Sequence, residues 1–135
     1  MLTSEEKTLL LNAARKARGA AYAPYSGFSV GAALLAEDGR LFVGCNVENA
    51  AFSPSLCAER VAVGTAVAAG ARSFRAIAVI GGHGDREEPC SPCGVCRQTL
   101  AELASADTLV LFLGEEGIEE HALGDLLPVG FTLKQ

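Results

Sequence analysis

Residues 74–114 read FRAIAVIGGHGDREEPCSPCGVCRQTLAELASADTLVLFLG, and this segment alternates between strand and helix patterns. The short apolar runs 74–82 and 107–114 are typical of buried strands, and the stretch 93–104 between them is typical of a helix. Two strands joined through a helix require a right-handed crossover, which makes the strands parallel. The segment therefore predicts one strand–helix–strand unit of an α/β fold.

Upstream of this unit, the sequence predicts a first helix, a β-hairpin and a second helix. Thr3 and Glu6 have the spacing of a capping box, and apolar residues recur on one face of the helix that follows. Residues 29–47 have the pattern of two strands joined by a tight Asp-Gly turn. The Ala/Val-rich segment 57–70 has the composition of a buried helix that ends at a glycine. We therefore predict an α/β protein, a three-layer α/β/α sandwich with a mixed sheet.

The composition indicates one domain, 1–135, that binds a small ligand. Half of the 135 residues are apolar, which is more apolar surface than so small a fold hides alone, so we expect a homo-oligomer. The net charge of −5 provides no basic surface for a nucleic acid partner. The N-terminal residues lack the order of a signal peptide, and no apolar run reaches membrane-spanning length. We therefore expect a cytoplasmic protein with no membrane partner.

Five cysteines, three of them at Cys-x-x-Cys-x-x-Cys spacing, indicate a metal site. In a reducing compartment such a cluster binds a metal or takes part in catalysis more often than it forms disulfides. We predict that Ser91 caps the helix that follows and that Pro92 takes its first position. Cys93 and Cys96 then lie on one face of the first turns, where both sulfurs could reach one ion.

A third thiol, Cys57, is predicted at the start of the second helix, which Ser55 could cap and whose dipole lowers the pKa of a thiol. Three protein ligands on zinc leave a fourth position open for water, which is typical of a catalytic site with one Zn²⁺ per subunit. Glu59 could lie beside this site and act as the general acid and base. Arg60 and Arg97 flank the ligands, and we expect both to hydrogen-bond the sulfurs.

The residues alone leave two other interpretations of the cysteines open. Cys90, Cys93 and Cys96 match the beginning of a bacterial ferredoxin run, although the expected Cys-Pro is absent and a helix follows. Alternatively, Cys57 and this triplet could form a closed four-thiolate zinc site, which would make the chain a binding module without catalysis. Cys45 lies in a strand pattern and is interpreted as a small buried side chain without a further role.

The two spaced motifs CAER (57–60) and PCGVCRQ (92–98) are accompanied by three further characteristic blocks. These blocks are YAPYSGFSVGAAL (22–34), GCNVENAAFSPSLCAER (44–60) and LLPVGF (126–131). In this order and over nearly the whole chain, the sequence resembles the small, homotetrameric, zinc-dependent cytidine deaminases. Two spaced motifs with flanking blocks are far more specific than a single Cys-x-x-Cys.

The resemblance implies a cytidine deaminase-like fold and hydrolytic deamination of cytidine and deoxycytidine to uridine and deoxyuridine, with release of ammonia, in pyrimidine salvage. Zinc-bound hydroxide would attack C4 of the cytosine ring, and Glu59 would carry a proton first to N3 and then to the departing ammonia. By the same resemblance, Asn46 and Glu48 would bind the ribose hydroxyls, and Phe28 would stack on the base.

The resemblance also implies that backbone groups around Ala58 and Ser91 read the edge of the pyrimidine. Phe131 would reach into the pocket of a neighbouring subunit, so that a homotetramer shares its sites. The chain departs from the family pattern at two places: Phe52 stands where many relatives carry tyrosine, and LPVGF (127–131) replaces the commoner LPGAF. A deaminase of a modified cytosine nucleoside such as blasticidin S shares the zinc motif and stays open as an alternative.

Several polar residues also have simpler interpretations. Asn46 and Glu48 could be turn residues at the end of a strand, but their alternation places both side chains on one face, as a pair that grips one sugar must, and this favours the sugar-binding interpretation. His83 lies in the loop pattern GGHGD and is interpreted as a solvated histidine. His121 follows the acidic run 115–120, which we interpret as a solvated helical face.

Overall fold

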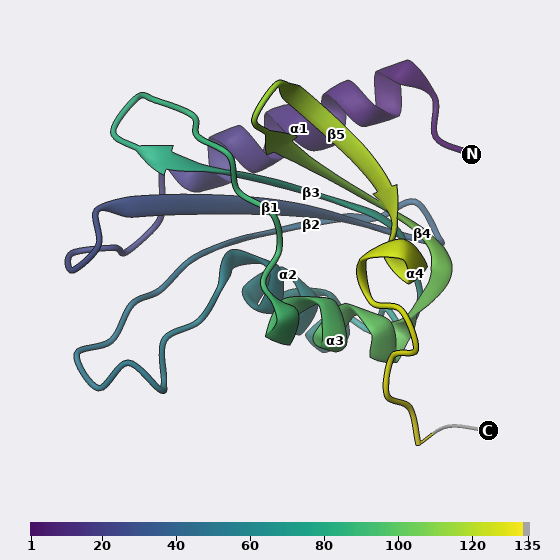
Figure 1. Ribbon diagram of the computed structural model, residues 1–135. Coiled ribbons are helices and arrows are strands. Elements are labelled where there is room, and N and C mark those ends of the chain that lie inside the picture. Colours follow the sequence, from purple (N-terminus) through teal and green to yellow (C-terminus); the bar gives the residue numbers. More distant parts are fainter. Residues whose placement is uncertain (134–135) are drawn as a thin grey trace.

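The computed structural model describes residues 1–133 and places a five-stranded sheet between helices on both of its faces (Figure 1). The elements follow one another as α1 (Ser4–Arg18), β1 (Phe28–Ala36), β2 (Leu41–Cys45), α2 (Ala58–Ala68), β3 (Phe74–His83), α3 (Gly94–Leu103), β4 (Ala104–Gly114), β5 (Gly117–Ala122) and α4 (Leu123–Leu126). The predicted capping box of α1 is confirmed, because Thr3 and Glu6 each accept the backbone N–H of the other.

The sheet has the strand order β2-β1-β3-β4-β5 and is mixed, as predicted. β1 pairs antiparallel with both β2 and β3, so β2 and β3 run in the same direction and α2 forms the crossover between them. β3 pairs parallel with β4, which makes β3, α3 and β4 the predicted strand–helix–strand unit. β5 pairs antiparallel with β4 at the edge. The N-termini of α2 and α3 consequently lie at the same end of the sheet.

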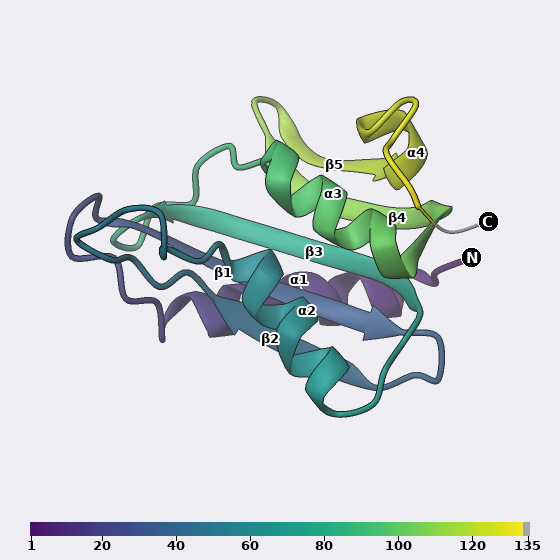
Figure 2. The same cartoon turned by 90° about the horizontal axis from the view of Figure 1, so that it is seen from below.

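Alternate side chains of β1 face opposite layers, because successive residues of a strand point to opposite faces. Ala32 and Leu34 belong to the core beneath α2 and α3, whereas Ala33 and Leu35 belong to the core beneath α1. Figure 2 shows α2 and α3 over one face of the sheet and α1 behind the other. The prediction of a three-layer α/β/α sandwich is therefore confirmed.

A glycine lets α2 approach the sheet more closely than any other residue would. A Cβ atom on Gly44 of β2 would lie 2.5 Å from the carbonyl oxygen of Ala58 and 2.5 Å from the nitrogen of Ala62. Both atoms belong to the backbone of the first turns of α2, which cannot rotate away as a flexible side chain could. This contact sets the position of the end of α2 that carries the predicted zinc ligand and acid/base group.

The starts of both cysteine-bearing helices correct our prediction. Cys57 and Cys93 are themselves the N-cap residues of α2 and α3. The predicted caps, Ser55 and Ser91, lie two residues upstream in the preceding loops, and Pro92 also precedes its helix. At α3 the reason is that the sulfur of Cys93 accepts a backbone N–H of the first turn, as a serine hydroxyl does at other helix starts, whereas Cys57 makes no such bond at α2.

The acidic run 115–120 corrects a second prediction. Its residues form a turn and then the first part of β5 instead of a helix, and Gly117 at the start of β5 has a φ of 135°. The ring of His121 stacks on Phe112 of β4, with 5.3 Å between the ring centroids, and its Nε2 lies 2.8 Å from Glu119 Oε1. Charged side chains on an exposed edge strand protect its free edge from pairing, and they do not reveal which secondary structure they occupy.

Candidate metal centre

The sulfurs of Cys57, Cys93 and Cys96 lie within 4.8 Å of one another, at the converging starts of α2 and α3. The distance from Cys57 Sγ to Cys93 Sγ is 3.9 Å, and that from Cys93 Sγ to Cys96 Sγ is 3.4 Å. With Zn–S bonds of about 2.3 Å, two ligands of a tetrahedral zinc lie about 3.8 Å apart. The sulfurs are therefore spaced as ligands of one zinc ion, and three soft donors suit that metal.

The charge distribution among these thiols also suits a cation. A hydrogen bond from Cys96, supported by Arg60, lowers the pKa of Cys57 to about 5, so this side chain is a thiolate at neutral pH. The hydrogen bond to Cys57 and its own burial raise the pKa of Cys96 above its usual value. A thiolate and its neighbouring thiols release their protons together when a metal binds, because only the deprotonated form is a ligand.

Arg60 and Arg97 differ in what they contact. Arg60 Nη2 lies 3.9 Å from Cys57 Sγ and donates to the Ser55 carbonyl at 3.0 Å, so its charge faces the thiolate. Arg97 corrects the prediction: its Nε donates to the Pro92 carbonyl at 2.7 Å and its Nη1 to the Leu126 carbonyl at 2.9 Å. Instead of bonding a sulfur, Arg97 connects the loop that precedes α3 with α4.

Glu59 is a buried carboxyl group beside the sulfurs. Its side chain belongs to the first turn of α2, and only 4% of the residue is exposed. Burial, together with the negative charge of Cys57, raises the pKa of Glu59 to about 7. A carboxyl group with a pKa near the working pH exchanges protons readily in both directions, which is the property of a general acid and base.

A cavity of about 410 Å³ opens over Cys57, Cys93 and Glu59. The predicted substrate-binding residues that line it are Asn46, Glu48, Ala58 and Ser91. Pockets for small molecules are typically of this size, apolar, with a few convergent polar groups. The structure therefore brings most of the predicted binding residues, two metal ligands and the predicted acid/base group into one pocket.

Asn46 and Glu48 also hold the segment that leads into β1. Asn46 Oδ1 accepts the N–H of Val30 at 2.8 Å, and its Nδ2 donates to the carbonyl of Phe28 at 2.8 Å. The Glu48 carboxylate accepts the N–H of Ser26 at 3.1 Å and also its hydroxyl. These bonds, the hydroxyl first, lower the pKa of Glu48, so its side chain faces the pocket as a carboxylate.

Phe28 and Phe131 lie outside the lining of this cavity in the described part of the chain. Phe28, at the start of β1, packs against Gly81 of β3 and lies next to Cys90, which lines the cavity. Phe131 is 68% exposed, and its carbonyl accepts a hydrogen bond from Nε2 of Gln98 in α3 at 2.9 Å. Both aromatic rings were predicted to meet substrate, and the single chain places one at the margin of the pocket and the other in solvent.

Cys90 lies outside the group of three sulfurs among residues 1–133. Its backbone N–H donates to the Leu113 carbonyl at 2.9 Å, and its sulfur packs against Gly81. Burial raises the pKa of Cys90 to about 12, so it lines the pocket as a neutral thiol. This placement fits neither the closed four-thiolate site nor the iron–sulfur interpretation, and sequence spacing gave no signal for it.

The sequence also gave no signal for the role of Phe52 as a pocket residue. The segment between β2 and α2 forms a long loop beyond the end of the sheet (Figure 1), and Phe52 lies in it with a positive φ of 62°. This conformation is unfavourable for a bulky residue. The side chain is 76% exposed while it also lines the pocket, so a large aromatic surface stands at the pocket rim.

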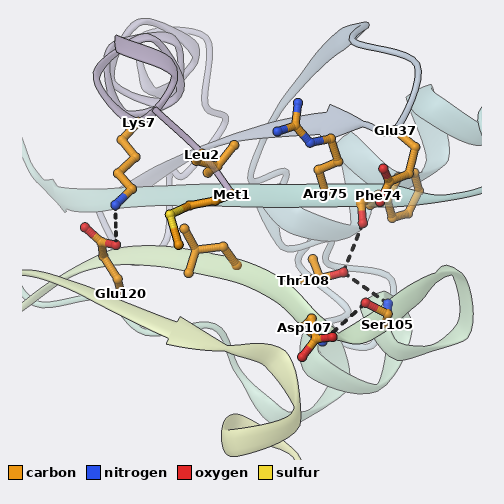
Figure 3. A pocket seen from close by; sticks show the side chains of 11 residues that line it. Met1, Leu2, Lys7, Glu37, Phe74, Arg75, Ser105, Asp107, Thr108 and Glu120 are labelled. Atoms are coloured by element: carbon orange, nitrogen blue, oxygen red, sulfur yellow. Dashed lines mark hydrogen bonds and ion pairs between the residues drawn. The ribbon is translucent and has the colours of Figure 1, made fainter. Parts of the chain in front are cut away.

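A second cavity, of about 520 Å³, lies between the start of α1 and the β3–β4–β5 part of the sheet (Figure 3). Lys7 bridges to Glu120 at 2.8 Å, and Arg75 pairs with Glu6 at 3.2 Å, so both side-chain cations are already neutralised. The Thr108 hydroxyl donates to the Phe74 carbonyl. We assign no ligand to this cavity.

Within residues 1–133, no helix combines the length and the apolar composition needed to cross a membrane.

Comparisons with known proteins agree with the geometry of the pocket. A family model described as the cytidine and deoxycytidylate deaminase zinc-binding region matches residues 4–112. Proteins named cytidine deaminase are 50% identical over 124 residues in Sporosarcina psychrophila (91% of this chain and 89% of the relative) and 45% identical over 128 residues in Halalkalibacterium halodurans (94% and 95%).

Solved structures of similar proteins extend the agreement to the fold. The crystal structure of cytidine deaminase from Burkholderia pseudomallei has a TM-score of 0.82 at 46% identity and covers 96% of this chain and 100% of that one. The corresponding values for cytidine deaminase from Mycobacterium tuberculosis are 0.81, 40%, 95% and 98%. In both comparisons the matched length is nearly the whole of this chain.

Proposed function

The chain belongs to the cytidine and deoxycytidylate deaminase family of zinc-dependent hydrolases, and on this premise we propose that it hydrolyses cytidine and deoxycytidine to uridine and deoxyuridine with release of ammonia. The observation that carries the proposal is the position of buried Glu59 beside the cluster of Cys57, Cys93 and Cys96, at a pocket that Glu59 lines together with two of these ligands. A closed structural zinc site would give this carboxyl group no function.

In the proposed mechanism, Cys57, Cys93 and Cys96 hold the zinc ion. When bound, zinc with three protein ligands supplies a water-derived nucleophile at neutral pH for attack at C4 of the cytosine ring. Glu59 protonates N3, which makes C4 more electrophilic, and then delivers a second proton to the leaving ammonia. Both protons come from the attacking water: Glu59 takes the first before it protonates N3 and takes the second before it protonates the amino group, which leaves as ammonia. The burial of Glu59 supports both transfers, because its raised pKa of about 7 makes either protonation state accessible. Arg60 offsets the negative charge of Cys57.

The remaining pocket residues bind and orient the nucleoside in this proposal. Asn46 and Glu48 bind the ribose hydroxyls, supported by their place in the lining and by the negative charge of Glu48. Backbone groups of Ala58 and Ser91 read the edge of the pyrimidine, and Phe28 stacks on the base. A grip on the 3′-hydroxyl serves both cytidine and deoxycytidine, which is why we include both substrates.

We further propose a homotetramer in which neighbouring subunits complete each pocket. Two exposed aromatic side chains, Phe52 at the pocket rim and Phe131 near the C-terminus, support it, because large exposed apolar groups mark interaction sites. In the tetramer Phe131 enters the pocket of a neighbour. A cytoplasmic location is consistent with five unpaired cysteines, whose thiols persist in a reducing compartment.

The test is a substrate comparison with the zinc-loaded protein. The loss of ultraviolet absorbance of cytidine, deoxycytidine and adenosine is followed together with ammonia release. We expect stoichiometric ammonia from both cytosine nucleosides and none from adenosine, and we expect sedimentation to give the mass of four chains. Zinc-loaded protein that leaves both cytosine nucleosides unchanged would disprove the proposed function.

A further inference from the structure

Phe28 meets a histidine at the edge of the pocket. Phe28 is the first residue of β1 and His83 the last residue of β3, and the two are partners in the antiparallel register. Their rings meet edge to face, with 5.1 Å between centroids and an angle of 79° between planes. His83 therefore ends a strand instead of lying in a loop, and its side chain is exposed, as predicted, while its ring also meets the ring of Phe28.

Glu88 fixes the histidine in this position. Its Oε2 accepts the backbone N–H of His83 at 2.9 Å and lies 2.6 Å from the ring nitrogen Nδ1. The backbone N–H of Glu88 donates to the Gly81 carbonyl at 2.8 Å, which holds the carboxylate beside β3. The hydrogen bond with His83 lowers the pKa of Glu88, so the group beside the ring is a charged carboxylate.

Arg18 fixes the loop that joins the histidine to the glutamate. Its Nη2 donates to the carbonyls of Gly84 at 2.8 Å and Arg86 at 3.2 Å, and its Nε donates to the Ser29 carbonyl at 2.9 Å. One arginine from α1 therefore connects the start of β1 with the turn after β3. Arg18 therefore fixes the backbone next to Phe28 and the backbone next to His83, and so sets the spacing between these two residues.

The other sides of Phe28 are equally constrained. A Cβ atom on Gly81 would lie 2.7 Å from the ring and 2.9 Å from the sulfur of Cys90, so the ring fills the space that this glycine leaves, next to a pocket-lining thiol. The carbonyl of Phe28 accepts the side-chain amide of Asn46, and its N–H donates to the hydroxyl of Ser26. The edge of the ring on the remaining side meets the ring of His83.

We propose that the His83–Glu88 pair positions the ring of Phe28 for stacking on the pyrimidine base. The inference rests on the proposed function, in which Phe28 is the stacking residue. His83 acts through Phe28 and does not touch the reacting atoms, so it is a positioning residue. Because stacking stabilises bound substrate and transition state alike, loss of the histidine raises KM and leaves kcat unchanged.

The experiment compares two histidines of similar surroundings. His121 also contacts a phenylalanine and a glutamate, Phe112 and Glu119, but lies in β5 outside the pocket. We expect His83→Ala to raise KM for cytidine about three- to tenfold, the range of an aromatic pair contact, with kcat and zinc content unchanged. We expect His121→Ala to leave all three at their wild-type values, and His83→Phe, which keeps a ring edge, to restore most of the affinity.

A double-mutant cycle and a binding measurement separate this role from a general structural one. In a Phe28→Leu background, His83→Ala should add no further increase in KM, because its effect passes through the missing ring. Calorimetric affinity for uridine should fall by the same factor as KM rises, without any turnover. If wild type deaminates cytidine, two results would overturn the inference: an unchanged KM in His83→Ala, or an equal rise in KM from His83→Ala in the wild-type and Phe28→Leu backgrounds. Absence of cytidine turnover in wild type would instead overturn the proposed function and this inference with it.

Discussion

Replacing Gly44 by alanine should damage both stability and catalysis, although Gly44 touches no substrate. The added Cβ would lie 2.5 Å from backbone atoms of Ala58 and of Ala62. Ordinary contacts of these atoms are near 3.5 Å, so α2 must retreat from β2 by about 1 Å. Overpacking of this kind costs about 1–3 kcal/mol of the free energy of unfolding. The same movement displaces Cys57 and Glu59, and a misplacement of about 1 Å can lower kcat about a hundredfold.

A matched substitution controls for the loss of a glycine as such. Gly19 ends α1 with a φ of −64°, and the nearest atom to an added Cβ is the Lys16 carbonyl oxygen at 3.4 Å. We expect Gly19→Ala to change unfolding by less than about 1 kcal/mol and to retain full activity. The assays are thermal unfolding at one protein concentration, zinc content, and kcat for cytidine. If Gly44→Ala matches Gly19→Ala in unfolding temperature and kcat, the close packing of α2 on β2 does not position the site.

Three further substitutions test separate parts of the account. Cys90→Ser should keep one zinc per chain by elemental analysis and nearly full activity, because its sulfur lies outside the ligand group; loss of zinc would restore the four-thiolate interpretation. The pKa of Glu48 is lowered from 4.5 by Ser26, so its stabilising contribution is complete above pH 4.5 and is lost as the pH falls through the lowered value. In urea unfolding, Glu48→Gln should therefore cost more stability at pH 7 than at pH 3, and an equal cost at both would refute the assigned bonds. Arg97→Ala should reduce the free energy of unfolding by about 1–3 kcal/mol, because the carbonyls of Pro92 and Leu126 lose their hydrogen-bond donor. The zinc content of this variant, measured by chemical analysis, should equal that of wild type.

The parts of the fold that local patterns encode were predicted correctly. The capping box at Thr3, the hairpin of β1 and β2, and the β3–α3–β4 crossover each follow from spacing or periodicity within a short segment. The starts of α2 and α3 were not, because cysteine is an uncommon N-cap; at α3 the sulfur of Cys93 replaces the expected serine hydroxyl, whereas Cys57 begins α2 without a side-chain cap bond. β5 was missed because charged side chains at an exposed edge carry no clear alternation.

In the site, too, residues within local motifs were predicted, whereas contacts between distant segments were not. Cys57, Cys93, Cys96 and Glu59 were predicted from two spaced motifs, and the structure brings the three sulfurs and the carboxyl group together. Arg97 was assigned to the sulfurs from its place in the chain, but adjacency in sequence does not give the direction of a long side chain. Contacts between distant strands, such as that of His83 with Phe28, arise from register and are not visible in either segment alone.

The central claim is that Glu59 moves protons beside an open zinc site, and Glu59→Gln tests it most directly. Glutamine preserves the shape of the buried side chain but cannot exchange a proton at neutral pH. Zinc per chain and the loss of cytidine absorbance are measured on wild type and variant side by side. We predict about one zinc per chain in both, with turnover of wild type only. A variant that holds zinc and still deaminates cytidine at the wild-type rate would contradict the account.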